Sequence, residues 1–287
     1  MTAIGVITRT KDRPILLARA LDSVLSQTTN DWQLVVVNDG GEPGPVNALI
    51  KERETDFNGR VQVIHHPHSH GMEAASNAGL RVLESDYVMI HDDDDSLYPE
   101  FMERTIEYLR NPPHPSIKAV ITHCERVWEI LTDDSVSEQK VHPYNTWVQH
   151  VSLRQMLVEN FFAPIAFVFD RQACIEVGSF REDLPVLGDW DFNIRFLSKY
   201  EIGVVPQILA RYHNRVHTTN NAYDSTVTAQ TDKHAFYDGL LRNEWLRDDI
   251  ASGRTGKGLI STQARMLGDL AWDIKNAKKK KWRLSRK

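Results

Sequence analysis

Four consecutive aspartates, Asp92 to Asp95, follow the apolar run Tyr-Val-Met-Ile-His directly. In an extended backbone, Asp92 and Asp94 point to the same side. Two carboxylates on one side repel each other unless a cation lies between them. Mg²⁺ and Mn²⁺ prefer oxygen ligands and are often bound by one or two carboxylates together with the phosphates of a substrate. The run therefore predicts a metal site that binds phosphates. The alternative is a solvated acidic loop before a helix that begins near Pro99.

Two further polar residues stand where apolar runs end. Thr8 follows the run Ala-Ile-Gly-Val-Ile, and Asp39 lies in the turn sequence Asn-Asp-Gly-Gly. Turn chemistry alone accounts for both residue types. In parallel sheets, however, ligands bind beyond the carboxyl ends of the strands. Thr8, Asp39 and the four aspartates would then converge on one crevice.

The first 98 residues alternate between short apolar runs and helical patterns. Strands are expected at 3–8, 32–41, 60–66 and 86–91, and helices at 15–27, 46–54 and 71–85. This alternation predicts an α/β fold with a mostly parallel central sheet and helices on both faces.

The second half of the chain has a more mixed pattern. We expect helices at 99–110, 152–161 and 189–200, a strand at 119–130, a strand with a short helix at 164–180, a strand pair or one strand with an extension at 202–213, and a polar loop or hairpin tip at 132–145. From 229 the pattern is mostly helical, with a break at 252–258. The predicted domains are 1–225, divided into two halves (1–98 and 99–225), and a helical C-terminal extension (226–287) with a basic tail.

Composition limits the class and the partners of this protein. The chain has 287 residues, is 41% hydrophobic and carries a net charge of −5. No apolar run reaches the roughly 18–20 residues that a membrane span needs. The N-terminus lacks a secretory pattern, and Cys124 and Cys174 match no metal or redox spacing. We therefore expect a cytoplasmic protein.

The last 13 residues, 275–287, differ in charge from the rest of the chain. They hold eight Lys or Arg residues and no acid, so the body is more acidic than the net charge suggests. The tail is expected to contact an anionic membrane surface, at the inner face of the membrane. The alternatives are that it binds a polyanionic acceptor or remains solvated. An acidic body opposes nucleic acid binding. The motif His-His-Pro-His-Ser-His at 65–70 is interpreted as a solvent-exposed turn.

Four segments in order resemble the inverting family 2 glycosyltransferases of the GT-A fold. These segments are VITRTKDRPILLARALDSVLSQTTNDWQLVVVNDGG, GMEAASNAGLRVLESDYVMIHDDDDSLYPEF, FDRQACIEVGSFREDLPVLGDWDFNIRF and ARYHNRVHTTNN. Each is weak alone, but their order and spacing over residues 3–221 make the resemblance strong. It implies a nucleotide-diphosphate-sugar donor held by Mn²⁺ or Mg²⁺, with 1–98 as the nucleotide-binding half and 99–225 as the acceptor-side half.

The resemblance assigns roles at the donor end of the site. Asp39 would hydrogen-bond the base, most typically uracil, so a UDP-sugar is favoured. The nucleotide-sugar-binding residues implied in this way are Thr8, Arg9, Asp39, Asp92 and Asp93. Asp94 would contact the metal.

A late histidine, His217, would complete the metal site or touch the diphosphate, with His213 as its competitor. Ser76 stands where many relatives carry a phosphate-binding Arg. Arg81 and Arg211 are candidate substitutes.

Asp189, in Gly-Asp-Trp-Asp-Phe, matches the family's catalytic base, which takes the proton of the acceptor hydroxyl during a single inverting displacement. Asp191 is interpreted as structural. The sequence has Gly188 where Glu is usual.

The function predicted is therefore a metal-dependent, inverting, hexosyltransferase-type glycosyltransferase that acts on a glycan or glycoconjugate hydroxyl. Two alternatives remain. One is a non-catalytic module that binds carbohydrate or nucleotide-sugar. The other is a nucleotidyl- or phosphoryl-transferring enzyme on a similar sheet, although the chain contains no Gly-x-x-x-x-Gly-Lys-Ser/Thr loop.

Overall fold

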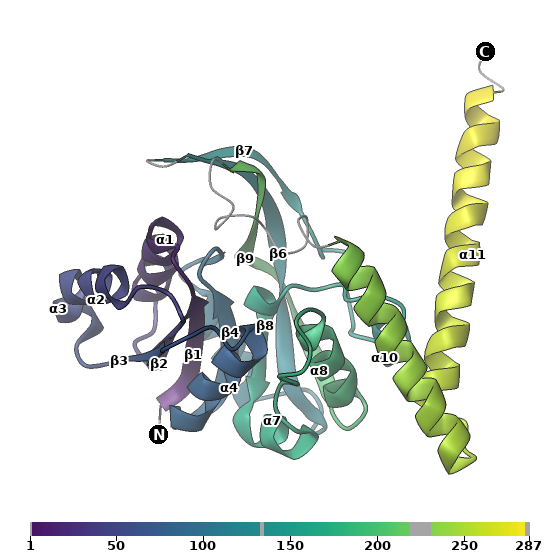
Figure 1. Cartoon of the computed structure of the whole chain (residues 1–287), viewed down its shortest axis with the longest axis horizontal. Coiled ribbons are helices and arrows are strands. Elements are labelled where there is room, and N and C mark those ends of the chain that lie inside the picture. The colour runs from purple at the N-terminus through teal and green to yellow at the C-terminus, as the bar shows by residue number, and fades with distance from the viewer. Residues whose placement is uncertain (1, 133–134, 219–230, 285–287) are drawn as a thin grey trace.

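The computed structural model describes residues 2–132, 135–218 and 231–284, of which 216–218, 231, 271 and 276–284 are described by their backbone alone. In this part of the chain one mixed sheet forms the centre, with helices packed on both faces (Figure 1). The strands are β1 (Thr2–Thr10), β2 (Trp32–Asp39), β3 (Val61–His66), β4 (Ser85–Asp92), β5 (Ser96–Leu97), β6 (Ile117–Leu131), β7 (Val136–Pro143), β8 (Phe167–Asp170) and β9 (Glu201–Thr218). The α/β prediction is confirmed.

The helices between these strands bring the chain back across the sheet. They are α1 (Pro14–Leu25), α2 (Pro43–Glu52), α3 (Glu54–Phe57), α4 (Met72–Val82), α5 (Phe101–Arg110), α6 (Leu153–Met156), η1 (Pro164–Ala166), α7 (Arg171–Val177), α8 (Gly188–Leu197), α10 (Thr231–Ser252) and α11 (Lys257–Leu284). Pro14 and Pro43 stand in the first turns of α1 and α2, where a missing N–H costs nothing.

The strand order within the sheet is β3-β2-β1-β4-β8-β6-β9-β5, with β7 added on β6. The first four strands are parallel to one another. β8 is antiparallel to both β4 and β6, and β6 is parallel to β9. The carboxyl ends of β2, β1 and β4 are therefore adjacent, and they carry Asp39, Arg9 and Asp92 to one edge of the sheet.

The structure corrects two expectations for the second half and decides between the two alternatives for a third. Residues 136–143 form a real strand, β7, antiparallel to β6. Its side chains are mostly exposed, so no apolar alternation marks it. The helix expected at 152–161 ends at Met156, and the apolar residues after it, Phe161 and Phe162, are buried in the core instead. The segment 202–213 is part of one long strand, β9.

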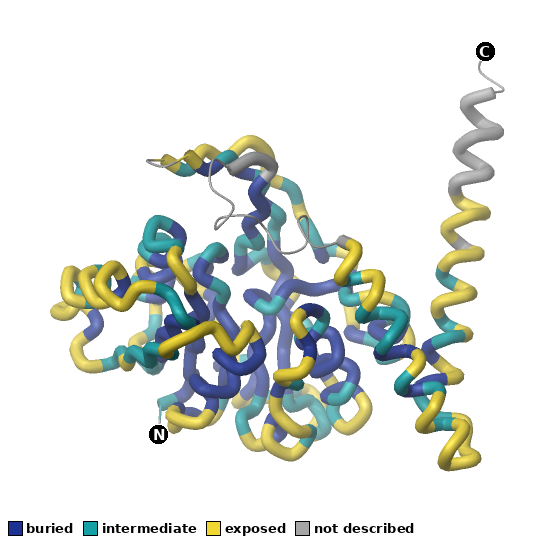
Figure 2. The backbone as a smooth tube through the Cα atoms, in the orientation of Figure 1, coloured by how far each residue is buried: buried dark blue, intermediate teal, exposed yellow. Residues whose placement is uncertain are grey.

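The core consists of two apolar clusters, one for each face of the sheet, and Figure 2 shows them as the dark centre of the molecule. Trp245 of α10 belongs to one cluster and lies 5.5 Å, centroid to centroid, from Trp190 of α8. Arg242 of α10 donates to the carbonyl oxygens of Leu157 and Val158. The helical C-terminal region expected from the sequence is present, and α10 packs against α8 and the segment that follows α6. The predicted boundary at 225 lies outside the described residues.

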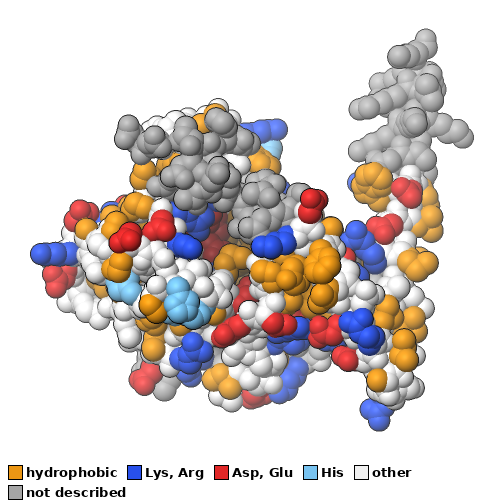
Figure 3. All heavy atoms as spheres, in the orientation of Figure 1, with side chains coloured by type: hydrophobic (Ala, Val, Ile, Leu, Met, Phe, Trp, Pro, Cys, Tyr) orange, Lys and Arg blue, Asp and Glu red, His pale blue; other side chains and the backbone are white. Residues whose placement is uncertain are grey.

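Helix α11 projects away from the sheet (Figure 1). Apolar side chains gather along α10 and α11 in Figure 3. Those exposed on α11 are Leu259, Ile260, Met266, Leu267, Leu270, Trp272 and Ile274. Among the described residues no helix is long and apolar enough to cross a membrane.

Candidate active site

The four aspartates alternate in exposure at the end of β4. The side chains of Asp92 and Asp94 are 24% and 15% exposed, whereas Asp93 and Asp95 are buried. Asp92 is the last residue of β4, and the backbone then turns toward β5. The pair expected to face one way is thus the pair that solvent reaches.

Arginines surround these carboxylates. Arg9 of β1 donates to Asp92 Oδ1 from Nε and Nη2, at 2.9 and 2.5 Å. Arg13 lies 2.5 Å from Asp93 Oδ1, and Arg215 of β9 lies 2.5 Å from Asp94 Oδ2. The positive charge that the sequence analysis required is therefore supplied in part by the chain itself.

Two carboxylate oxygens remain for a metal. Within the described part of the chain, hydrogen bonds use only Oδ1 of Asp92 and only Oδ2 of Asp94. No group of three or more His, Cys, Asp or Glu among the described residues is arranged to hold an ion. A divalent cation that keeps most of its coordination for substrate phosphates and water needs only one or two carboxylates. Asp92 and Asp94 fit such an ion, which would act as a Lewis acid toward a diphosphate leaving group.

The charges around Asp94 keep it ionised. Burial alone would raise its pKa, but Arg215 and Arg13 hold the pKa of Asp94 well below its usual range. Asp93 is fully buried, and burial outweighs the attraction of Arg13 and raises the pKa of Asp93 to about 6. Asp94 therefore remains an anion throughout the working pH range.

Asp39 anchors the loop between β3 and α4. Its two carboxylate oxygens accept hydrogen bonds from the backbone N–H groups of His70 and Gly71 and from Ser69 Oγ, and they lie 2.8 Å from His66 Nδ1. Burial opposes ionisation, but these hydrogen bonds hold the pKa of Asp39 at about 2. The adjacent Gly40 has φ +79°, a conformation that favours glycine. Asp39 thereby fixes the start of α4 at the sheet edge.

Thr8 is fully buried near the end of β1. Its Oγ1 lies 3.4 Å from His91 Nδ1 on the neighbouring β4. Burial lowers the pKa of His91 to about 4, so the ring is neutral. Thr8 lies in the layer beneath Arg9 and the aspartate turn.

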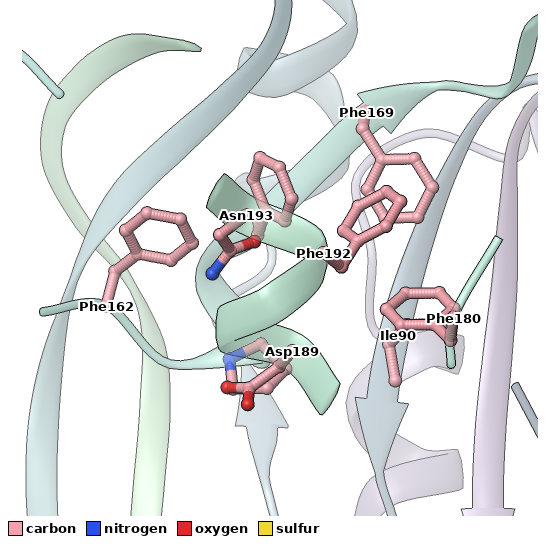
Figure 4. Close-up of a pocket in the computed structure, with 9 residues that line it drawn as sticks. Ile90, Phe162, Phe169, Phe180, Asp189, Phe192 and Asn193 are labelled. Carbon is pink, nitrogen blue, oxygen red and sulfur yellow. The ribbon is translucent and has the colours of Figure 1, made fainter. Parts of the chain in front are cut away.

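Asp189 stands in the first turn of α8, and Figure 4 shows it beside a small cavity of about 20 Å³ whose other walls include the rings of Phe162, Phe180 and Phe192. Burial raises the pKa of Asp189, although the Trp190 backbone N–H, Arg9 and Asn160 oppose the rise. Asn160 Nδ2 donates to Asp189 Oδ2 at 2.7 Å. A half-buried, oriented carboxylate with a raised pKa has the properties of a general base.

Asp191 has the structural role expected for it. It is buried and accepts from Arg195 Nε at 2.7 Å, one turn further along α8. Arg195 also donates to the carbonyl oxygens of Val177 and Ser179. Asp191 therefore ties α8 to the end of α7 rather than facing the site.

Of the two departures from the family pattern, Ser76 contacts Arg9 directly and Gly188 lies against Glu73. Arg9 Nη1 donates to Ser76 Oγ at 3.1 Å and lies 3.9 Å from Glu73 Oε2. A Cβ at Gly188 would lie 2.3 Å from Glu73 Oε1, so a side chain at this position requires Glu73 to move. The candidate substitutes lie elsewhere: Arg81 is largely exposed and Arg211 pairs with Glu125 and Glu138.

Of the two candidate histidines, His213 is buried with both ring nitrogens engaged. Its Nδ1 lies 2.9 Å from Glu129, and its Nε2 lies 2.9 Å from Ser96 Oγ. It therefore stabilises the packing of β9 against β5 and β6. The backbone of His217 pairs with Ile130 in the sheet, but its side chain lies outside the described residues.

The motif at 65–70 forms the turn expected of it. His66 and His70 pack edge to face with centroids 5.1 Å apart, and His68 lies 4.4 Å from His70. Figure 3 shows histidines gathered on the surface of this region. Asp39 and the turn hold each other in place.

Four side chains that the sequence analysis did not assign to the site lie in it: Arg13, Glu73, Asn160 and Arg215. Glu73, Asn160 and Arg215 are common residue types that no motif singles out, although Glu73 and Arg215 lie in segments that carry the family resemblance, so only their tertiary neighbours reveal them. Arg13 had a weak signal, because it directly precedes the Pro14 that opens α1.

The fold and the site together define a class of protein. An α/β sheet whose acids and arginines gather at the carboxyl ends of adjacent parallel strands binds anionic ligands at that edge. The chain belongs to glycosyl transferase family 2, whose sequence profile matches residues 5–178. The expected family and the GT-A fold are both confirmed.

Curated relatives carry the same class of activity in their names. The chain is 28% identical over 204 residues to the uncharacterized glycosyltransferase YwdF of Bacillus subtilis, covering 71% of each chain. It is 26% identical to the amylovoran biosynthesis glycosyltransferase AmsE of Erwinia amylovora, covering 70% of this chain and 71% of that one.

Solved structures share the fold at low identity. Residues 1–349 of S. aureus TarS, in complex with UDP-GlcNAc, match with a TM-score of 0.57 at 15% identity over 74% of this chain and 59% of that one. The mannosyltransferase PcManGT of Pyrobaculum calidifontis, in complex with GDP-Man and Mn²⁺, matches with a TM-score of 0.55 at 18% identity, covering 72% and 56%. The chain thus spans about three fifths of the solved chains that it matches.

Proposed function

We propose that this protein is a metal-dependent, inverting glycosyltransferase that moves a sugar from a nucleoside-diphosphate donor, with UDP favoured, to a hydroxyl of a glycan or glycoconjugate. The observation that carries the proposal is the position of Arg9 at one edge of the sheet, where its guanidinium is hydrogen-bonded to Asp92 of β4 and also feels the charge of Asp189 from α8. Family membership and neighbours that bind UDP, UDP-GlcNAc or GDP-Man with Mn²⁺ support the donor class.

The donor end neutralises a diphosphate. Asp94 and Asp92 are the proposed ligands of Mn²⁺ or Mg²⁺, which supplies Lewis-acid stabilisation of the leaving diphosphate. Arg9 and Arg215 lie beside these carboxylates and add positive charge where the diphosphate would lie. Asp39 and Thr8 are proposed to line the base and ribose pocket, Asp93 to hold the turn through Arg13, and His217 to approach the same ion.

The acceptor end removes one proton. The acceptor oxygen attacks the anomeric carbon from the face opposite the diphosphate and forms the new C–O bond. The bond between that carbon and the phosphate oxygen breaks, and the diphosphate leaves with the electron pair. Asp189, oriented by Asn160, takes the hydroxyl proton. One displacement gives inversion at the anomeric carbon.

The C-terminal region is proposed to associate with the inner face of a cytoplasmic membrane. Exposed apolar residues along α11 precede the eight basic residues of 275–287. A basic segment gains about 1 kcal/mol per Lys or Arg near an anionic surface. Cosedimentation with vesicles containing anionic lipid, against neutral vesicles, tests this part.

The test of the activity is release of nucleoside diphosphate. The donors are UDP-glucose, UDP-GlcNAc and GDP-mannose, each with and without Mn²⁺. The acceptors are water and a panel of p-nitrophenyl glycosides. Asp189→Asn is expected to lower turnover by about 10²–10⁴-fold while calorimetric donor binding is retained. Asp183→Asn, at an exposed acid five residues before α8, is the matched control and is expected to match the unaltered chain.

Three results would contradict the proposal in different ways. Donor binding without turnover would indicate a non-catalytic module. Release of pyrophosphate from nucleoside triphosphates would indicate nucleotidyl transfer. Full turnover by Asp189→Asn would show that another group is the base.

A further inference from the structure

A side chain from another helix occupies the space beside the first turn of α8, at a position where α8 itself has no side chain. Gly188 opens α8, one residue before Asp189. A Cβ placed on Gly188 would lie 2.3 Å from Oε1, 2.4 Å from Cδ and 2.6 Å from Cγ of Glu73. The carboxyl group of Glu73, from the first turn of α4, therefore fills the space beside the proposed base.

Glu73 is interposed between the two ends of the site. Its side chain is 5% exposed. Oε1 packs against Gly188, while Oε2 faces Arg9 Nη1 at 3.9 Å. In the described part of the structure Oε2 has no hydrogen-bond partner. One carboxyl group thus touches both the arginine of the donor end and the helix turn of the acceptor end.

Charge balance for Arg9 does not account for this buried acid. Arg9 is already paired with Asp92 through two hydrogen bonds, and it also donates to the Met72 carbonyl oxygen and to Ser76. A buried carboxyl oxygen without a partner costs stability that an apolar side chain would not cost. Such a group at a site edge requires another reason.

The charged groups that face Glu73 are one cation and three acids. Arg9 comes from β1, Asp92 from β4, and Asp189 and Asp191 from α8. Burial, together with these acids and against the attraction of Arg9, raises the pKa of Glu73 to about 8. At neutral pH Glu73 therefore separates Arg9 from Asp189 without adding a negative charge beside the base.

We propose that Glu73 is a positioning residue of this site: it lies between Arg9 and the first turn of α8, keeps the guanidinium on Asp92, and prevents it from pairing with Asp189. If Arg9 paired with Asp189, it would lower the basicity of the carboxylate that must accept the acceptor proton. The inference rests on the proposed function, because it assigns Glu73 a role in setting the strength of that base.

The test moves the carboxyl group between helices. Glu73→Ala is expected to lower kcat by about 10–100-fold, to leave calorimetric UDP-sugar binding in Mn²⁺ unchanged, and to shift the acidic limb of the pH–rate profile downward. Glu73→Ala combined with Gly188→Glu returns a carboxyl group to the same space from α8. The kcat of this double variant is expected to be at least tenfold higher than that of Glu73→Ala. Gly188→Glu alone is expected to lower turnover, because its side chain and that of Glu73 would then occupy the same space.

Two further variants separate positioning from simple packing. Glu73→Gln keeps the shape of the side chain and keeps it neutral. The turnover of this variant at pH 7 is therefore expected to lie within about threefold of that of the unaltered chain. Its turnover is not expected to decline as the pH passes 8. Glu84→Ala, an exposed acid just after α4, is the control. All variants are assayed on the donors and acceptors described above, with thermal unfolding measured in parallel.

The outcomes separate this inference from the proposed function. Equal loss of stability, donor binding and turnover in Glu73→Ala, without recovery in the double variant, would overturn the inference, as would unchanged turnover and pH dependence in every Glu73 variant. Absence of nucleoside-diphosphate release from the unaltered chain would overturn the proposed function, and this inference with it.

Discussion

The two ends of the site hold acids in opposite electrostatic settings. At the aspartate turn, Asp94 is shared by Arg215 and Arg13, so it stays ionised despite burial. At the other end of the site, Glu73 of α4 and Asp189 of α8 share Arg9, which Asp92 already engages, and burial raises the pKa of both. The carboxyl groups at the two ends of the site thus have different pKa values because different numbers of arginines surround them. A pair of acids with separated pKa values is the arrangement that divides an anion site from a proton acceptor.

Removing the negative charge of Asp94 is expected to have the largest effect on activity. Asp94→Asn is expected to lower Mn²⁺-dependent turnover by about 10³-fold, because charge stabilisation by the ion contributes several kcal/mol. The measurement is nucleoside-diphosphate release over a Mn²⁺ titration. An unchanged rate and midpoint would show that the turn is a salt-bridged loop and not an ion site.

Removing the cation that keeps Asp94 ionised is expected to affect folding. Arg215 is 2% exposed, so Arg215→Met leaves a partly buried carboxylate with a lost partner and is expected to lower the free energy of unfolding by about 2–3 kcal/mol. Urea denaturation measures this.

The exposed pair of Arg110 with Asp31 offers the matched control for this variant. Arg110→Met is expected to cost less than about 1 kcal/mol. Equal costs for the two variants would contradict the special status of the buried pair.

Asp39 gives the donor end a pH dependence of stability. Its pKa is about 2 in the folded chain and higher when unfolded, so its contribution is fully present above about pH 4 and is lost as the pH falls toward 2. Asp39→Ala is expected to lower the free energy of unfolding by about 1–2 kcal/mol at pH 7. The difference in this free energy between the variant and the unaltered chain is expected to shrink as the pH falls.

Thermal unfolding from pH 7 to pH 3 checks this behaviour, with the exposed Asp86→Asn as control. If the difference in stability between Asp39→Ala and the unaltered chain stays constant down to pH 3, the hydrogen bonds to Asp39 do not depend on its charge.

The smallest expected effect concerns the orientation of the base. Asn160→Ala removes the hydrogen bond to Asp189 Oδ2 and is expected to lower turnover by about 5–10-fold. Because the lost bond favoured the ionised carboxylate, the acidic limb of the pH–rate profile is expected to move upward. A downward shift would place Asn160 outside the environment of the base.

The first half of the fold and the residue types of the donor end were predictable because their signals are local. Apolar runs that alternate with helical spacing led to the parallel strands, and polar residues at run ends led to Asp39 and to the aspartate turn. β7 and the early end of α6 were missed because burial, and not a local pattern, decides them. The roles of individual site residues stay predictions until the variants are measured.

The sequence by itself determined the α/β fold and which acids stand at strand ends, since periodicity and turn chemistry are properties of neighbouring residues, and the order of four segments that resemble a known family indicated the family. Only the tertiary structure decided which of those acids are neutralised. Arg9, Arg215 and Glu73 reach the site from β1, β9 and α4, up to 121 residues away from their partners. The pKa of a carboxyl group depends on its neighbours in space, and a sequence orders only its neighbours along the chain.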